Sequence, residues 1–147
     1  MVAWERIFRG KRLPKMKVLD VGAGVSVDSR ATHAIDKFHT PHIEDYPNSE
    51  KVSNVEYYPK HIDVDKSALP YEDEFFDEVV SWGAWGYNFG NIRSGKELKR
   101  VLKTGGTIEV GIDATNLEHA KRLLTRAGFK IIDISAWQDW YKITAVK

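Results

Sequence analysis

The stretch Lys17-Val-Leu-Asp-Val-Gly-Ala-Gly24 decides the fold of this chain. Its first part, Lys17–Val21, is a short apolar run typical of a buried β-strand, and the glycines that follow indicate a tight turn. Six further runs of this kind are expected to be strands: Thr32–Asp36, His61–Asp65, Phe76–Ser81, Thr107–Ile112, Phe129–Ile134 and Trp140–Val146.

Two stretches between these strands have the spacing of amphipathic helices. Ser94–Leu102 repeats apolar residues at helical intervals, and Ser94 is its expected N-cap. Asn116–Ala127 carries an apolar stripe and ends before Gly128, a residue suited to terminate a helix. Alternating strands and helices predict an α/β fold with a largely parallel sheet.

The composition fits one soluble domain. The chain has 147 residues, of which 42% are hydrophobic and 29% charged, and a net charge of +1. A chain of this length buries about two thirds of its unfolded surface, enough for one core, so residues 1–147 are expected to form a single domain. Residues 1–16 form a basic N-terminal extension, and the proline-containing segment Phe38–Lys60 is expected to be a loop.

Several kinds of protein are excluded or disfavoured. The absence of cysteine rules out disulfides, a cysteine nucleophile and thiolate metal clusters. The N-terminus lacks an apolar signal core, and the uncharged run Val79–Ile92 is too short to span a bilayer. We therefore expect a cytoplasmic protein without membrane contact. A solvated loop explains His39 and His42 as well as metal binding does, so no metal site is expected.

Residues at the ends of four expected strands predict a ligand site. In an open α/β sheet, ligands bind beyond the carboxyl ends of the strands. The glycines after Val21 let a ligand approach the backbone, and Asp36 and Asp65 end the next two strands. Such carboxylates can accept hydrogen bonds from a ribose diol or an exocyclic amine. Ser81 and Trp82 follow at the end of the fourth strand.

With these residues the sequence resembles the class I S-adenosylmethionine-dependent methyltransferases over most of residues 17–146. Val18–Gly24 is similar to their glycine-rich first motif, and Asp65–Ser81 to the segment joining their third and fourth strands. Glu97–Thr107 resembles their helix-to-strand turn, and Ala127-Gly-Phe129 the lead into their last strand pair. The resemblance implies a Rossmann-like, mostly parallel seven-stranded sheet with helices on both faces, an antiparallel last strand and, here, a truncated first helix.

The resemblance also implies S-adenosylmethionine as cofactor. The glycine turn would line its methionine part, and Asp20 would support that turn. Ser81 and Trp82 would contact the methionine end, where the methyl group meets the acceptor. The residues expected to bind the cofactor are Asp20, Gly22, Ala23, Gly24, Asp36, Asp65, Lys66, Ser81 and Trp82.

The adenosine part would be bound by the acidic residues. Asp36 would bind the ribose hydroxyls, and Asp65 would accept a hydrogen bond from the adenine amine, with Lys66 beside the ring. Asp63 is the alternative for the adenine contact if the third strand lies two residues from its expected place.

Two departures from the family pattern leave alternatives open. Ser26 stands where the third glycine of the motif is usual, and only about a dozen residues separate Gly24 from Asp36, so the first helix is reduced. An inactive relative that acts as a binding module therefore stays an alternative. A nicotinamide oxidoreductase is less favoured, because a dinucleotide pyrophosphate needs a glycine where Val27 stands and a helix N-terminus.

The acceptor is less well defined than the cofactor. His39, His42 and Tyr87 are candidate bases, but none is assigned as catalytic. The aromatic segment Trp82–Gly90 either borders the substrate opening or packs into the core. The chain lacks both the Asn/Asp-Pro-Pro-aromatic motif and any cysteine, which disfavours nucleic-acid acceptors. A small-molecule acceptor is expected, and a nucleic-acid or protein acceptor stays open.

Overall fold

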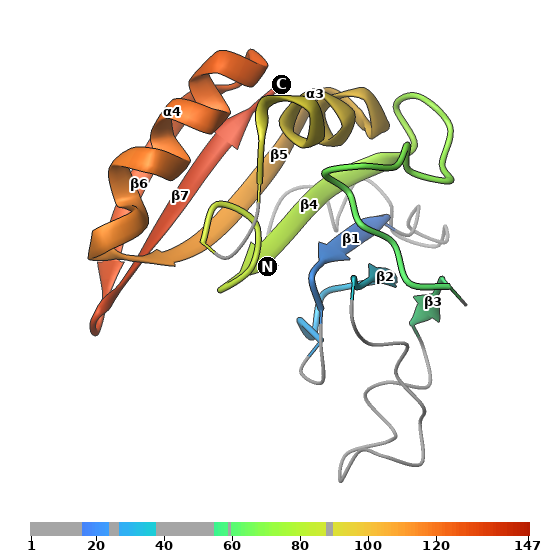
Figure 1. Ribbon diagram of the computed structural model, residues 1–147, viewed down its shortest axis with the longest axis horizontal. Helices are drawn as coiled ribbons and strands as arrows, with labels where there is room; N and C mark the ends of the chain where they lie inside the picture. Colours follow the sequence, from blue (N-terminus) through green and yellow to red (C-terminus); the bar gives the residue numbers. More distant parts are fainter. Residues whose placement is uncertain (1–15, 24–26, 38–54, 59, 88–89) are drawn as a thin grey trace, which may run out of the picture.

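The computed structural model describes residues 16–23, 27–37, 55–58, 60–87 and 90–147. Within them, seven strands form one sheet in the order β3-β2-β1-β4-β5-β7-β6 (Figure 1). β7 runs antiparallel to both of its neighbours, and the other strand pairs are parallel. The strands are β1 (Val18–Val21), β2 (His33–Ile35), β3 (Glu56–Tyr57), β4 (Phe76–Trp82), β5 (Leu102–Asp113), β6 (Lys130–Trp137) and β7 (Trp140–Val146).

This topology confirms the predicted α/β, Rossmann-like class with an antiparallel last strand. Six of the seven strands lie where the sequence predicts them, and β7 has the predicted bounds. The third strand was placed wrongly: β3 lies at Glu56–Tyr57, inside the expected loop, and His61–Asp65 forms no strand. A strand of two residues carries too little alternation to be recognised in a sequence.

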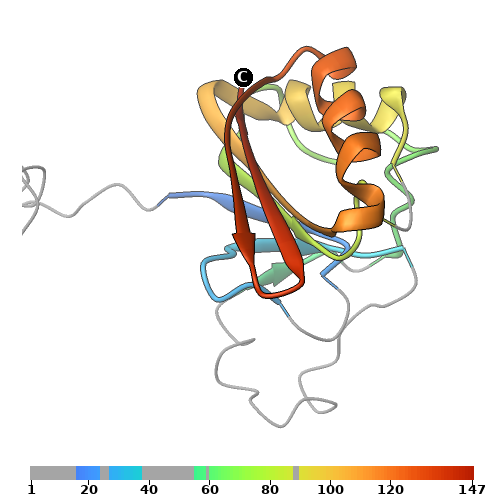
Figure 2. The same ribbon diagram turned by 90° about the vertical axis from the view of Figure 1, so that its left-hand side faces the viewer.

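The core lies on one face of the sheet. The helices α3 (Ile92–Val101) and α4 (Leu117–Ala127), the latter preceded by a 3₁₀ turn η2 (Ala114–Asn116), pack against that face (Figure 2). Their buried residues form one cluster with every second residue of the central strands. The sheet residues of this cluster include Leu19, Val21, Val79, Ile108, Val110, Ile112, Ile143 and Ala145.

We call the opposite side of the sheet the open face. The described helices leave it uncovered, so helices on both faces are not confirmed within the described part of the chain. The described residues between β1 and β2, 22–23 and 27–32, contain no helix, in line with the expected truncation. Among the described helices, none is long and apolar enough to cross a membrane.

A buried hydrogen-bond cluster fixes the start of α3. Asn91, rather than the predicted Ser94, is the N-cap, and Ser94 lies at the third helical position in a capping box. The fully buried Oγ of Ser94 accepts hydrogen bonds from Asn91 N at 2.9 Å and from Trp85 Nε1 at 2.8 Å. Ser94 therefore provides the hydrogen-bond acceptor for the indole N–H, the only polar side-chain group of the fully buried Trp85.

We expect Ser94→Ala to lower the free energy of unfolding by about 1–3 kcal/mol, because it leaves the buried indole N–H without an acceptor. Urea denaturation measures the loss. The control is Thr125→Ala on the exposed side of α4, whose hydroxyl bonds only to Lys121 O; we expect a change below about 0.5 kcal/mol. Equal losses in the two variants would contradict the role of Ser94.

Candidate functional site

The turn after β1 is tied to the end of β2. Gly22 has a φ of 72°, a conformation that favours glycine. The backbone N–H groups of Gly22 and Ala23 both donate to Ile35 O, at 3.0 and 3.2 Å. Gly24, the last predicted residue of this turn, lies outside the described residues. The turn thus lies directly beside Asp36, which follows β2.

Asp20 supports this turn from within β1. It is 4% exposed, and its Oδ2 accepts a hydrogen bond from Asp28 N at 2.8 Å. The pKa of Asp20 is raised to about 7, mainly by burial and to a smaller extent by the charges of Asp28 and Asp36. The hydrogen bond from Asp28 N and the charge of Arg30 act in the opposite direction. The carboxyl group of Asp20 therefore ionises near neutral pH.

The segment after β3 packs against the end of β2. Ile62 N donates to Asp36 O at 2.9 Å. Both carboxylate oxygens of Asp63 are engaged inside the protein, because Oδ1 accepts from Asp65 N at 3.1 Å and Oδ2 pairs with Lys37 Nζ at 3.3 Å. Asp63, the alternative for the adenine contact, is thus the less suitable of the two residues.

Asp65 differs from Asp63 in having an oxygen to spare. Its Oδ2 accepts from Gly90 N at 3.0 Å, and its carbonyl accepts from Asn91 Nδ2 at 3.3 Å. Its Oδ1 is buried and has no hydrogen-bond partner, the only such side-chain atom among the described residues. A buried acceptor without a donor is costly, so this atom fits a ligand N–H. The neighbouring Lys66 is exposed.

Ser81 requires a correction. The residue is fully buried, and unlike the Oδ1 atom of Asp65 its hydroxyl already has partners inside the protein. Its hydroxyl donates to Val21 O at 2.8 Å and accepts from Trp85 N at 3.0 Å. Ser81 therefore joins the end of β1 to the loop after β4 and positions the site rather than contacting the cofactor.

The aromatic residues after β4 have both of the expected environments, the core and the surface near the site. Trp85 is fully buried and belongs to the core, whereas Trp82 is 38% exposed and Tyr87 37%. The Tyr87 ring lies 5.8 Å from the Trp140 ring, at an angle of 30°. Of the candidate bases, Tyr87 lies at this edge of the sheet, while His39 and His42 fall outside the described residues.

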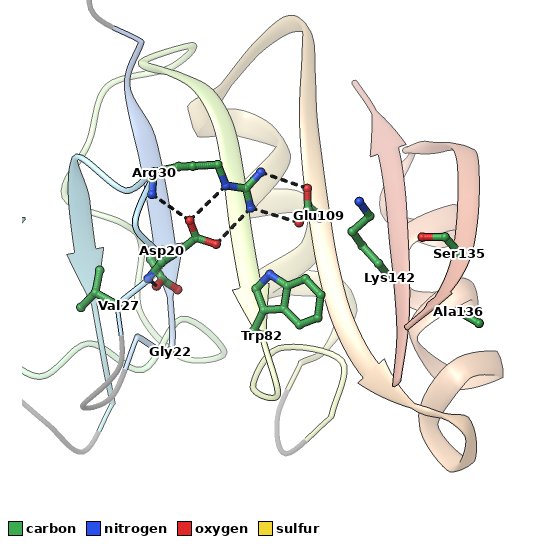
Figure 3. Close-up of a pocket in the computed structure, with 10 residues that line it drawn as sticks. Asp20, Gly22, Val27, Arg30, Trp82, Glu109, Ser135, Ala136 and Lys142 are labelled. Atoms are coloured by element: carbon green, nitrogen blue, oxygen red, sulfur yellow. Dashed lines mark hydrogen bonds and ion pairs between the residues drawn. The ribbon is translucent and has the colours of Figure 1, made fainter. Parts of the chain in front are cut away.

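A cavity of about 660 Å³ lies on the open face (Figure 3). Three predicted cofactor-binding residues line it, namely Asp20, Gly22 and Trp82, but Asp36, Asp65 and Lys66 do not. Its far side is formed by Lys142 on β7 and by Ser135 on β6. Its size suits a small-molecule ligand.

Arg30, which the sequence analysis did not single out, bridges this cavity. Its guanidinium donates to Asp28 at 3.0 Å from both Nε and Nη2, to Glu109 at 3.0 and 3.2 Å, and to Glu78 at 3.3 Å. These bonds raise the pKa of Arg30, whereas burial raises the pKa of Glu78. The signal available in the sequence was one acidic residue within each of two predicted apolar strands, Glu78 in Phe76–Ser81 and Glu109 in Thr107–Ile112.

We expect the stability of the wild type to fall relative to Asp20→Asn as the pH rises from about 4 to 7. In this window the unfolded chain ionises Asp20 at 3.8 while the native state keeps its proton up to about 7. The resulting loss in the free energy of unfolding of the wild type, relative to Asp20→Asn, reaches at most a few kcal/mol. It stays constant above about pH 7. Denaturant titrations at several pH values measure it. Asp133→Asn, an exposed carboxylate, is the control; parallel curves for wild type and Asp20→Asn would refute the assignment.

Comparison with known proteins finds similar structures but no relative by sequence. No protein-family model matches the sequence, and no curated protein matches it. A TehB-like S-adenosylmethionine-dependent methyltransferase from Corynebacterium glutamicum has a TM-score of 0.70 at 16% identity, over 97% of this chain and 85% of that one. An S-adenosylmethionine-dependent methyltransferase from Mesorhizobium loti has a TM-score of 0.66 at 15% identity, over 99% and 98%.

A third similar structure is that of the cyclase SpnF, with a TM-score of 0.64 at 17% identity, over 90% of this chain and 75% of that one. At such identities the likeness concerns the fold, and one fold hosts several reactions. The chain has the fold of the class I S-adenosylmethionine-dependent methyltransferases.

Proposed function

We propose that this chain binds S-adenosylmethionine at the carboxyl edge of β1, β2 and β4 and transfers its methyl group to a small molecule. The observation that carries the proposal is the buried Oδ1 of Asp65, which lacks a donor among the described residues. Asp65 follows three residues after Ile62, whose N–H donates to Asp36 O, and Gly22 N donates to Ile35 O, so backbone hydrogen bonds link the segments that carry these residues.

In the proposed complex, each residue at this edge binds a different part of the cofactor. The Gly22 turn offers backbone without a side chain to the methionine part, and Asp20 holds that turn through Asp28. Asp36 binds the ribose hydroxyls, and the spare oxygen of Asp65 accepts from the adenine amine. S-adenosylmethionine itself supplies an activated methyl group, so the protein contributes binding and alignment.

The acceptor reacts through a lone pair on oxygen or nitrogen. It forms a bond to the methyl carbon, the carbon–sulfur bond breaks with its electrons going to sulfur, and the methylated acceptor passes a proton to solvent. Such a reaction needs reactants held in line more than it needs a strong base. We therefore assign no catalytic base.

Calorimetric titration with S-adenosylhomocysteine tests the proposal. We expect Asp65→Asn to weaken binding by about 1–3 kcal/mol, because the amide keeps the bond from Gly90 N and places an NH₂ group where the spare oxygen lies. Asp36→Ala should have a loss of similar size. The matched control is Asp63→Asn, whose oxygens are already engaged; its affinity should stay within about threefold of the wild type.

Three results would count against the proposal. Absence of binding to the wild type at millimolar S-adenosylhomocysteine leaves the binding-module alternative. Binding of NAD in its place supports an oxidoreductase. Equal losses for Asp65→Asn and Asp63→Asn show that the adenine contact is assigned wrongly.

A further inference from the structure

Four residues lie side by side across the sheet at the cavity. Trp82 on β4 pairs with Gly111 on β5, Gly111 pairs with Lys142 on β7, and Lys142 pairs with Ser135 on β6. Trp82, Lys142 and Ser135 line the cavity. Neighbouring strands are about 4.8 Å apart, so Trp82 and Lys142, two strands apart, are close enough to contact one small ligand.

The absence of a side chain at Gly111 gives the cavity an aromatic surface. A Cβ placed on Gly111 would come within 2.0 Å of Trp82 Cε3, so the indole ring lies directly against the β5 backbone. Trp82 keeps 38% of its surface exposed and lines the cavity. The indole thus contributes a broad, flat apolar surface between the glycine turn and Lys142 (Figure 3).

Lys142 gives the same cavity a cation that is not paired within the described part of the chain. Arg30, the other cation of the cavity, is bound by the carboxylates of Asp28, Glu78 and Glu109. Lys142 is half-buried, and its ammonium group forms neither a hydrogen bond nor an ion pair with any residue the structure describes. Its charge acts on Glu78, where it opposes the rise of the pKa that burial causes. An ammonium group in this position fits an anionic ligand.

Lys142 lies too far from the glycine turn to serve the cofactor. The order β1-β4-β5-β7 places three strand spacings, about 14 Å, between β1 and β7. A methionine chain held at Gly22 does not extend that far. An anion at Lys142 therefore belongs to a second molecule, located on the far side of Trp82 from the turn.

We propose that the cavity on the open face is the acceptor site and takes a small aromatic acid. The ring packs on Trp82, the carboxylate pairs with Lys142, and the nucleophilic oxygen or nitrogen points toward the glycine turn. That the bound acid is the methyl acceptor rests on the proposed function. The binding of an aromatic acid to this cavity can be tested without that assumption.

The test uses the full chain and three pairs of probes: 4-hydroxybenzoate, anthranilate and nicotinate, and their uncharged amides. Ligand-observed NMR measures binding to the wild type, Lys142→Met, Lys142→Arg and the control Lys130→Met on the exposed end of β6. We expect at least one acid to bind, to lose about tenfold or more in Lys142→Met, and to be retained in Lys142→Arg and Lys130→Met. The amides should bind wild type and Lys142→Met equally.

Two further measurements separate the possible causes. Gly111→Ala displaces the indole and should weaken acid and amide alike; Lys142→Met should leave the affinity for S-adenosylhomocysteine unchanged. The proposal is overturned if no acid binds the wild type at millimolar concentration, if Lys142→Met binds acids normally, or if it loses S-adenosylhomocysteine instead. If S-adenosylhomocysteine fails to bind the wild type while acids bind through Lys142, the proposed function falls and the aromatic-acid site stands.

Discussion

Arg30 holds together the open face of the sheet. Its guanidinium engages Asp28 from the connection after β1, Glu78 from β4 and Glu109 from β5. Glu109 is 9% exposed and would be costly to bury without this partner. No helix occupies the described part of the short connection between β1 and β2. The Arg30 side chain therefore links β4 and β5 on a face of the sheet that the described helices leave uncovered.

This arrangement separates two kinds of chemistry in one region. The buried carboxyl group of Asp20 on β1 supports the glycine turn, and its burial, with a smaller effect of the charges of Asp28 and Asp36, raises its pKa to about 7. Farther along the sheet, Arg30 pairs with Glu109, and the ammonium group of Lys142 has no hydrogen-bond or ion-pair partner among the described residues. The cavity thus has an acidic side toward the turn and a cationic side toward β7, with Trp82 between them. A ligand with both an aromatic ring and a negative charge matches this polarity.

The fold alone does not decide the reaction, because methyltransferases and a cyclase share it at similar TM-scores. Individual atoms are more informative. Asp63 and Asp65 are two residues apart and of the same type, yet both oxygens of Asp63 are engaged, and one oxygen of Asp65 has no partner among the described residues. Ser81 shows the opposite case, since a residue at the expected strand end turned out to be buried and structural.

The sequence by itself determined the strand-and-helix alternation, the glycine turn and the acidic residues at the strand ends, because these depend on local periodicity and backbone freedom. It misplaced β3, whose two residues have no periodicity, and it chose Ser94 over Asn91 as the N-cap because both residue types cap helices. Only the tertiary structure decided which oxygen of Asp65 stays unpartnered and how Trp82, Gly111 and Lys142 meet. These residues are distant in the chain, and the pairing register of β4, β5 and β7 alone brings them together.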